Sequence, residues 1–305
     1  MTGTRGMPTP NTPFFRRAFL RQTGKLLIAI PAVNLIACGG GSNGTTTSDT
    51  TSTDSTTDST TDSTTDSTTT DTSSGSAESL TQDNSAVDWA SGGTDSMSVE
   101  YPNPFDEGYG NVCDLTDATT EGPCYSDTVE REDISEGLDG LPTRLCFRVV
   151  DANCNPVEGA TVDIWHCDTD GIYSGDGMQS VNFCTGGDAD HINNDYFRGT
   201  QTTDADGVVW FSTCFPGWYS SRAVHIHFMV IINGQTYVTS QVGFEDSLVD
   251  EILTSHSVYK SRGIADTHNY DDTVFPSSGY EGFLMDTHKM SDGSMLAWKT
   301  LMVSA

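Results

Sequence analysis

The stretch VHIHFMVII, residues 224–232, is followed by the dipeptide Asn233-Gly234 and then by QTYVTSQVGF, residues 235–244. Both flanking segments are rich in β-branched and aromatic residues, which favour strands. Asn-Gly is the dipeptide most typical of a two-residue hairpin turn. The sequence therefore predicts two long antiparallel strands that are joined at residues 233–234.

Shorter segments of the same character lie on both sides of this hairpin. They are apolar or alternating runs near Gly, Asp and Asn, and they cover residues 145–150, 160–165, 207–211 and 296–303. Many short strands separated by turn residues are typical of an all-β domain. Residues 250–253 suggest a helical turn, and we expect no long amphipathic helix in this part of the chain. We predict an antiparallel β-sandwich with long loops over residues 86–305.

The first 37 residues have the composition of an export signal. Arg16-Arg17 precedes Phe19-Leu20 and an apolar run at residues 26–37, which is the order of a secretory signal. The paired arginines resemble those of a twin-arginine signal. The apolar run is short and contains Pro31, so it does not suit a transmembrane helix. We predict an exported protein with its signal peptide at residues 1–37.

The end of this segment, Leu35-Ile36-Ala37-Cys38, resembles a bacterial lipobox. In that interpretation Cys38 is the lipidated first residue of the mature chain. The protein is then a lipoprotein whose lipid anchor holds it to a membrane on the periplasmic or outer cell surface. The alternative is a plain signal peptide followed by an incidental cysteine.

Residues 38–85 separate this signal from the predicted sandwich. They consist largely of Gly, Ser, Thr and Asp, with a Thr-Asp-Ser-Thr repeat between Thr53 and Thr68. Such a composition cannot bury an apolar core, because it contains almost no apolar side chains. We therefore predict a disordered tether over residues 38–85.

The charge balance excludes one class of partner. The chain carries 14 Lys and Arg against 43 Asp and Glu, a formal net charge of -29. Such a chain repels a phosphate backbone, so we expect no nucleic-acid binding.

The chain has 8 cysteines, and seven remain after Cys38. An exported domain lies in an oxidising compartment where disulfides can form, but an odd number leaves at least one thiol unpaired within the chain. Cys146 and Cys214 lie in strand-like segments and are expected to be buried thiols. No zinc-binding CxxC spacing occurs. The disulfide pairing is left open among Cys113, Cys124, Cys146, Cys154, Cys167, Cys184 and Cys214.

His225 and His227 are the first candidates for a functional site. Side chains at positions i and i+2 of a strand point to the same face, so the two imidazoles could ligate one metal ion. Taken alone, such a pair is more often two polar residues on a sheet surface. The interpretation therefore depends on the segments around the pair.

Those segments form a set of motifs in a fixed order. In chain order they are TEGPCY at 120–125, WHCDTDGIYS at 165–174, FRGTQTTDADG at 197–207, PGWY at 216–219, RAVHIH at 222–227 and TSQ at 239–241. In this order, between about Cys113 and Phe244, they resemble the intradiol ring-cleavage dioxygenases, the family of catechol 1,2-dioxygenase and protocatechuate 3,4-dioxygenase. Several motifs in one order are more specific than any one of them.

The resemblance implies a mononuclear non-haem iron(III) centre, Fe(3+), held by Tyr173, Tyr219, His225 and His227. Phenolate oxygen suits a hard, highly charged ion, whose charge can ionise a phenol that is otherwise neutral at neutral pH. The resemblance also implies that Arg222 and Gln241 act at the reacting ring, and that Tyr219 leaves the metal and serves as a base. The implied reaction is intradiol cleavage of a catechol by O2 to a cis,cis-muconate-type product, in a sandwich with long active-site loops.

Other residues and other functions compete with this interpretation. Tyr125, Tyr196, His166 and His191 lie near the motifs, and His166 suits a structural role. Residues 155–162 resemble a hairpin of adhesion domains, so a non-catalytic surface module is one alternative. A metal-binding surface protein without turnover is another.

The chain also departs from the family pattern at several places. Cys124 stands where the family usually has an aromatic residue, and residues 178–194 form an insert that can reshape the pocket. We see no N-terminal helical segment of the kind that dimerises catechol 1,2-dioxygenases. The oligomeric state is therefore left open.

Overall fold

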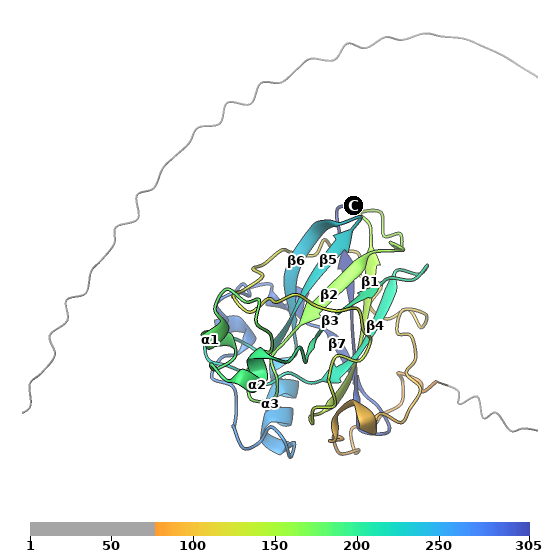
Figure 1. Ribbon diagram of the computed structural model, residues 1–305. Coiled ribbons are helices and arrows are strands. Elements are labelled where there is room, and N and C mark those ends of the chain that lie inside the picture. The colour runs from red at the N-terminus through yellow and green to blue at the C-terminus, as the bar shows by residue number, and fades with distance from the viewer. Residues whose placement is uncertain (1–76) are drawn as a thin grey trace, which may run out of the picture. The chain divides into compact units, whose positions relative to one another are not determined.

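The computed structural model describes residues 77–305, which form two four-stranded β-sheets arranged in two layers (Figure 1). One sheet has the order β4-β1-β8-β7, and the other has the order β3-β2-β5-β6. The strands are β1 (Pro142–Val150), β2 (Thr161–Trp165), β3 (Arg198–Thr202), β4 (Val208–Cys214), β5 (His225–Ile232), β6 (Gln235–Gly243), β7 (Asp286–Lys289) and β8 (Met295–Met302). The predicted all-β sandwich is confirmed for these residues.

The apolar core lies between the two sheets. Leu145 and Phe147 from β1 meet Val162 and Ile164 from β2 in one buried cluster. The ring centroids of Phe147 and Phe228 lie 6.3 Å apart across the layers. Burying a side chain of this size stabilises the fold by roughly 1.5–3 kcal/mol. The period-two pattern of the strands therefore directs one face of each sheet inward.

One strand pair departs from the antiparallel prediction. β1 and β8 run parallel, with Cys146 opposite Trp298, and β8 lies between β1 and β7. A tight turn cannot join parallel neighbours, so such a partner must come from far along the chain. The first sheet is therefore mixed, whereas the other strand pairs are antiparallel.

The β5–β6 hairpin forms as predicted. Asn233 has a φ of 51° and Gly234 a φ of 76°, so both adopt the left-handed conformation that a type I′ turn requires. The register places His227 opposite Gln241. Because directly opposite residues share a face, this pairing brings two of the predicted site residues together.

The helices are short and lie in the connections. α1 (Val181–Cys184) and α2 (Ala189–Ile192) lie between β2 and β3, within the predicted insert, and α3 (Asp246–Ser255) follows β6. The expected helical turn at residues 250–253 is thus part of a longer helix, which buries Val249, Ile252 and Leu253. The single-turn 3-10 helices are η1 (Gly93–Ser96), η2 (Asn269–Asp271) and η3 (Tyr280–Phe283).

The folded domain extends to the N-terminal side of the predicted boundary at residue 86. Leu80 and Asn84 are buried, and Asn84 Nδ2 donates a hydrogen bond to Lys289 O at 3.0 Å. Residues 77–85 therefore pack on the domain, near the turn between β7 and β8, and are not part of a tether. An apolar residue in a polar segment, Leu80, is the sequence signal for this packing.

Residues 1–76 lie outside the described part of the chain. They contain the predicted signal, the lipidation site Cys38 and most of the predicted tether. Between residues 77 and 305, no helix has the length and apolar character needed to cross a membrane. Export and lipidation therefore stay predictions.

Two disulfides pair four of the cysteines, Cys113 with Cys154 and Cys124 with Cys184. The free cysteines of the described region are Cys146, Cys167 and Cys214, and all three are buried. The expectation of buried thiols at Cys146 and Cys214 is confirmed. Burial raises the pKa of the Cys214 thiol to about 12, so this thiol stays protonated and unreactive at neutral pH.

Candidate functional site

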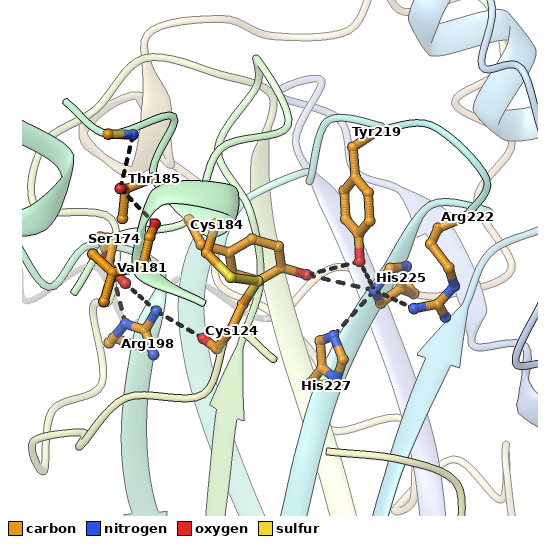
Figure 2. Close-up of a disulfide and its surroundings, with 12 residues drawn as sticks. Cys124, Ser174, Val181, Cys184, Thr185, Arg198, Tyr219, Arg222, His225 and His227 are labelled. Atoms are coloured by element: carbon orange, nitrogen blue, oxygen red, sulfur yellow. Dashed lines mark hydrogen bonds between the residues drawn. A yellow bond between two sulfur atoms is a disulfide. The ribbon is translucent and has the colours of Figure 1, made fainter. Parts of the chain in front are cut away.

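Two phenol oxygens and two imidazole nitrogens meet at one place (Figure 2). His225 Nε2 lies 3.1 Å from His227 Nε2 and 3.0 Å from Tyr219 Oη. Tyr173 Oη lies 3.5 Å from His225 Nε2 and 3.5 Å from Tyr219 Oη. The structure therefore brings together the four side chains that the sequence predicted as metal ligands.

The sheet explains why the two histidines share a face. On β5, Ile226 and Phe228 point into the core, so His225 and His227 point to the outer face of the same sheet. Trp165 of β2 pairs with His227 and stacks on its imidazole, with ring centroids 4.9 Å apart and an interplanar angle of 11°. Loops cover this outer face, so both imidazoles are buried.

Two loops that pack against each other carry the tyrosines. Tyr173 follows β2, and Tyr219 precedes β5. Gly217 allows the close approach of these loops, because a Cβ at this position would lie 2.4 Å from Thr169 O. Gly217 N also donates to Asp168 O at 3.0 Å. The motifs at 165–174 and 216–219 therefore form two loops that pack against each other and place the two tyrosines.

Arg198 on β3 holds the loop of Tyr173 in place (Figure 2). Its buried guanidinium donates to Ser126 O at 3.3 Å, to Cys124 O at 3.4 Å and to Ser174 O. Burial lowers the pKa of Arg198, and these carbonyl oxygens offset part of the cost of the buried charge. The arginine of the FRG motif therefore has a structural role beside the site.

The two histidines are held in the neutral form. Burial, with a contribution from the charge of Arg222, lowers the pKa of His225 to about 3. Burial and the neighbouring His225 lower the pKa of His227 well below its usual range. His225 Nδ1 lies 2.7 Å from Ala223 O, which can only accept, so Nδ1 carries the hydrogen and Nε2 keeps its lone pair. That lone pair is available for a metal ion.

The phenols are disfavoured as anions in this pocket unless a cation joins them. Burial raises the pKa of Tyr219 to about 12, although the charge of Arg222 opposes the rise. Burial likewise raises the pKa of Tyr173 well above its usual range. The single lone pair of His225 Nε2 cannot satisfy Tyr173, Tyr219 and His227 at once. A cation among the four atoms would relieve this crowding and favour the phenolates.

The donor set fits a ferric ion. Ligand atoms about 2 Å from one metal ion lie roughly 3 Å from each other, and the other three donor atoms lie 3.0 to 3.5 Å from His225 Nε2. Phenolate oxygens match the hardness of iron(III), and imidazole also suits iron. Between residues 77 and 305 no group of three or more His, Cys, Asp and Glu is arranged to hold a metal ion. The candidate centre therefore depends on its tyrosines.

Arg222 and Gln241 lie beside the four polar atoms, as predicted. Arg222 Nη1 is 3.3 Å from His225 Nε2, and Arg222 Nη2 donates to Gln241 Oε1. Gln241 Nε2 donates to Thr120 O at 2.8 Å. Ser221, with a φ of 72°, forms the bend before β5 that turns Arg222 toward the site.

Two contributors to the site were not predicted from the sequence. Asp272 forms an ion pair with Arg222 Nε at 3.0 Å. Gly122, with a φ of 76°, lies against His227, and a Cβ here would be 3.1 Å from the Cε1 atom of that ring. A buried arginine indicates that a carboxylate lies nearby, but the sequence has 43 acidic residues and does not single one out.

The other tyrosines and histidines near the motifs form hydrogen bonds outside the candidate site. His166 bonds a threonine hydroxyl and a backbone carbonyl, which agrees with the structural role expected of it. His191 Nδ1 lies 2.5 Å from Tyr196 Oη. Tyr125 Oη donates to Asp163 at 3.0 Å. These contacts leave all four outside the set that meets at His225.

A cavity of about 360 Å³ adjoins the two tyrosines. Its wall includes Ile172, Phe183 and the Cys124–Cys184 disulfide. Phe183 stands on α1, and 69% of it is exposed. The predicted insert at residues 178–194 therefore supplies part of the wall of the cavity.

A comparison with known families assigns a class of protein to this β-sandwich and its buried pocket. The family model described as Dioxygenase matches residues 120–281, a span that includes every candidate site residue. The chain belongs to this dioxygenase family.

Several characterised proteins are similar to this chain. Catechol 1,2-dioxygenase 1 from Acinetobacter lwoffii is 28% identical over 171 residues, which cover 48% of this chain and 51% of that protein. Hydroxyquinol 1,2-dioxygenase from Nocardioides simplex is 29% identical over 158 residues, which cover 48% of this chain and 52% of that protein. The chain thus spans about half the length of these curated relatives.

A solved structure shares the fold. The intradiol ring-cleavage dioxygenase from Tetranychus urticae superposes with a TM-score of 0.55 at 28% identity. The match covers 63% of this chain and 95% of that structure. The sandwich therefore shares its fold with that intradiol dioxygenase.

Proposed function

We propose that this protein cleaves a catechol-type ring by the intradiol route, with O2 and a mononuclear non-haem iron(III) held by Tyr173, Tyr219, His225 and His227. The observation that carries the proposal is that the donor atoms of Tyr173, Tyr219 and His227 each lie 3.0 to 3.5 Å from His225 Nε2 in a buried pocket. Membership of the dioxygenase family supports the same reaction class. Both atoms of O2 enter the product, a cis,cis-muconate-type diacid.

Ferric iron, when bound, supplies the charge that ionises the phenols and draws electron density from a chelated catechol, so that the ring can react with O2. Tyr219 is the less buried of the two tyrosines and adjoins the cavity, so its Oη is placed to accept a proton from a substrate hydroxyl. Arg222 Nη1 would stabilise negative charge that develops on the substrate. Trp165 and the Ala223 carbonyl hold the two imidazole rings in place.

The decisive experiment is to purify the protein, measure its iron content and visible spectrum, and follow O2 uptake with a panel of catechols. We expect a burgundy protein, because tyrosinate-to-iron(III) charge transfer absorbs visible light, and O2 uptake that depends on a catechol. Iron and colour without O2 uptake would favour the metal-binding alternative. A colourless protein that consumes no O2 after iron loading would refute the proposal.

Arg222→Ala is expected to keep iron and colour while turnover falls about a hundredfold, because the variant loses a charged donor at the reacting ring and not a ligand. Iron content, absorbance and initial rates of O2 uptake check this expectation. Arg148→Ala serves as the matched control, since Arg148 lies on β1 in the other sheet. Unchanged turnover in Arg222→Ala would remove Arg222 from the reaction.

We further propose that the protein is exported and anchored to a membrane through lipid on Cys38. The support is the order of paired arginines, apolar run and lipobox-like string at residues 16–38. Cys38→Ala should release the protein from the membrane fraction, since a lipid anchor supplies most of such membrane affinity. Fractionation and mass spectrometry of the mature N-terminus test this. A mature N-terminus far from Cys38 would contradict it.

A further inference from the structure

Asp272 directly follows η2, and its carboxylate accepts hydrogen bonds from three backbone amides. Its side chain is 0% exposed. Oδ1 accepts hydrogen bonds from Val274 N at 2.7 Å and Phe275 N at 2.8 Å, and Oδ2 accepts from Ala223 N at 2.6 Å. Burial alone would raise the pKa of Asp272, but the Arg222 charge and these N–H groups hold it below its ordinary value. The carboxylate is therefore a fixed anion in the interior.

Two of the three nitrogens of the Arg222 guanidinium form hydrogen bonds with neighbouring side chains. Arg222 Nε donates to Asp272 Oδ2 at 3.0 Å and lies 3.3 Å from Oδ1, while Nη2 donates to Gln241 Oε1. Because the guanidinium is planar, fixing the positions of Nε and Nη2 also fixes the position of its third nitrogen. That third group, Nη1, is directed toward His225 Nε2.

The segment that contains Asp272 also forms hydrogen bonds with the backbone on both sides of Arg222. Arg222 lies three residues before His225, so strand alternation alone would not place both on one face. The bend at Ser221 does so, and Thr273 Oγ1 donates to Ser221 O at 3.2 Å. The Ala223 amide is bonded to Asp272 on the other side of Arg222. One short segment therefore sets both the backbone and the side chain of the arginine.

We propose that Asp272 is a positioning residue for the ring-cleavage reaction, which holds the Arg222 guanidinium at the candidate site and acts on the substrate only through it. The inference rests on the proposed function, since it assigns a partner to the arginine of that reaction. Asp272 touches none of the four candidate ligands in the contacts described, so its removal should spare the metal.

Asp272→Asn, Arg222→Ala and the double variant form the test. Asp272→Asn should lower kcat about ten- to a hundredfold, since a misplaced catalytic group costs rate in this range, while KM changes by less than about threefold. Iron content and the visible band should match those of the unaltered protein. In the Arg222→Ala background the Asp272 change should lower kcat no further, because there is no guanidinium left to position.

Asp266→Asn is the matched control. Asp266 is an acidic residue of the same connection and accepts from Ser220 Oγ at 2.7 Å and from Ser221 N at 3.1 Å, so it also holds this backbone, but without contacting Arg222. Its variant should keep kcat within about twofold, because Asp266 is exposed, does not contact Arg222, and a surface substitution changes stability by no more than about 0.5 kcal/mol. Equal losses in Asp266→Asn and Asp272→Asn would show that the loop backbone matters and not the ion pair, which overturns the proposal.

A measurement independent of turnover completes the design. Each single variant should lower the urea midpoint of unfolding, because it leaves a buried charge unpaired, and the double variant should be no less stable than the worse single variant. Additive losses of stability, or a kcat for Asp272→Asn within twofold of the unaltered protein, would overturn the positioning role. If the unaltered protein consumes no O2 with any catechol, the proposed function itself fails, and the unfolding data still decide whether the two residues are coupled.

Discussion

His225→Ala and His227→Ala should each lose most of the bound iron. Each variant removes one of four donors from a site whose remaining atoms cannot close around the ion, so we expect iron affinity to fall by more than about a hundredfold. Iron analysis of the purified variants and their absorbance at visible wavelengths check this. His191→Ala is the matched control, because His191 bonds Tyr196 outside the site.

The tyrosines should respond differently from the histidines. Tyr173→Phe and Tyr219→Phe each remove one chromophoric phenolate, so the visible band should shift or weaken at a given iron content. If His225→Ala and His227→Ala both keep full iron and full colour, the metal lies elsewhere, and the dioxygenase proposal fails with the site.

Removing the Cys124–Cys184 disulfide, as Cys124→Ala with Cys184→Ala, should destabilise the protein by about 4 kcal/mol in the chain-entropy account. The cross-link spans 60 residues and forms part of the cavity wall beside Tyr173. For a domain of this size the midpoint of thermal unfolding should fall by roughly 10 °C. Turnover should fall as well, because α1 and the loop of Tyr173 lose their link to the segment of Cys124.

The second disulfide provides the control for that experiment. Cys113–Cys154 spans 41 residues, so its removal should cost a similar stability of about 4 kcal/mol. It does not line the cavity at the tyrosines. The two double variants should therefore have similar melting temperatures but different iron spectra and turnover. Identical effects on turnover would show that only global stability connects the disulfide to the site.

The parts of the fold that the sequence predicted are those that depend on neighbouring residues. Asn233-Gly234 specifies its turn locally, so the β5–β6 hairpin was predictable. The parallel pairing of β8 with β1 was not, because that pairing joins segments more than 140 residues apart and has no local signal. The boundary near residue 86 was wrong because the packing of Leu80 depends on a distant partner surface.

Some features of the candidate site likewise have a local sequence signal, whereas others depend on residues that are distant in the chain. The shared face of His225 and His227 follows from strand alternation, and the family motifs supplied Tyr173, Tyr219 and Arg222. Their approach to one another could only be seen in three dimensions, as could the ion pair of Arg222 with Asp272. The motifs include Trp165, which stacks on His227, whereas Asp272, which pairs with Arg222, lies in a connection outside the quoted motifs.

The central position of β8 has a consequence for biosynthesis. The ribosome must translate as far as residue 302 before β1 and β7 acquire the strand that lies between them. Until then the inner edge of β1 stays open, and such unpaired edges are where nascent chains associate wrongly. A stop codon anywhere before residue 295 removes the middle of the first sheet, so truncated products should aggregate and not accumulate as a smaller folded domain.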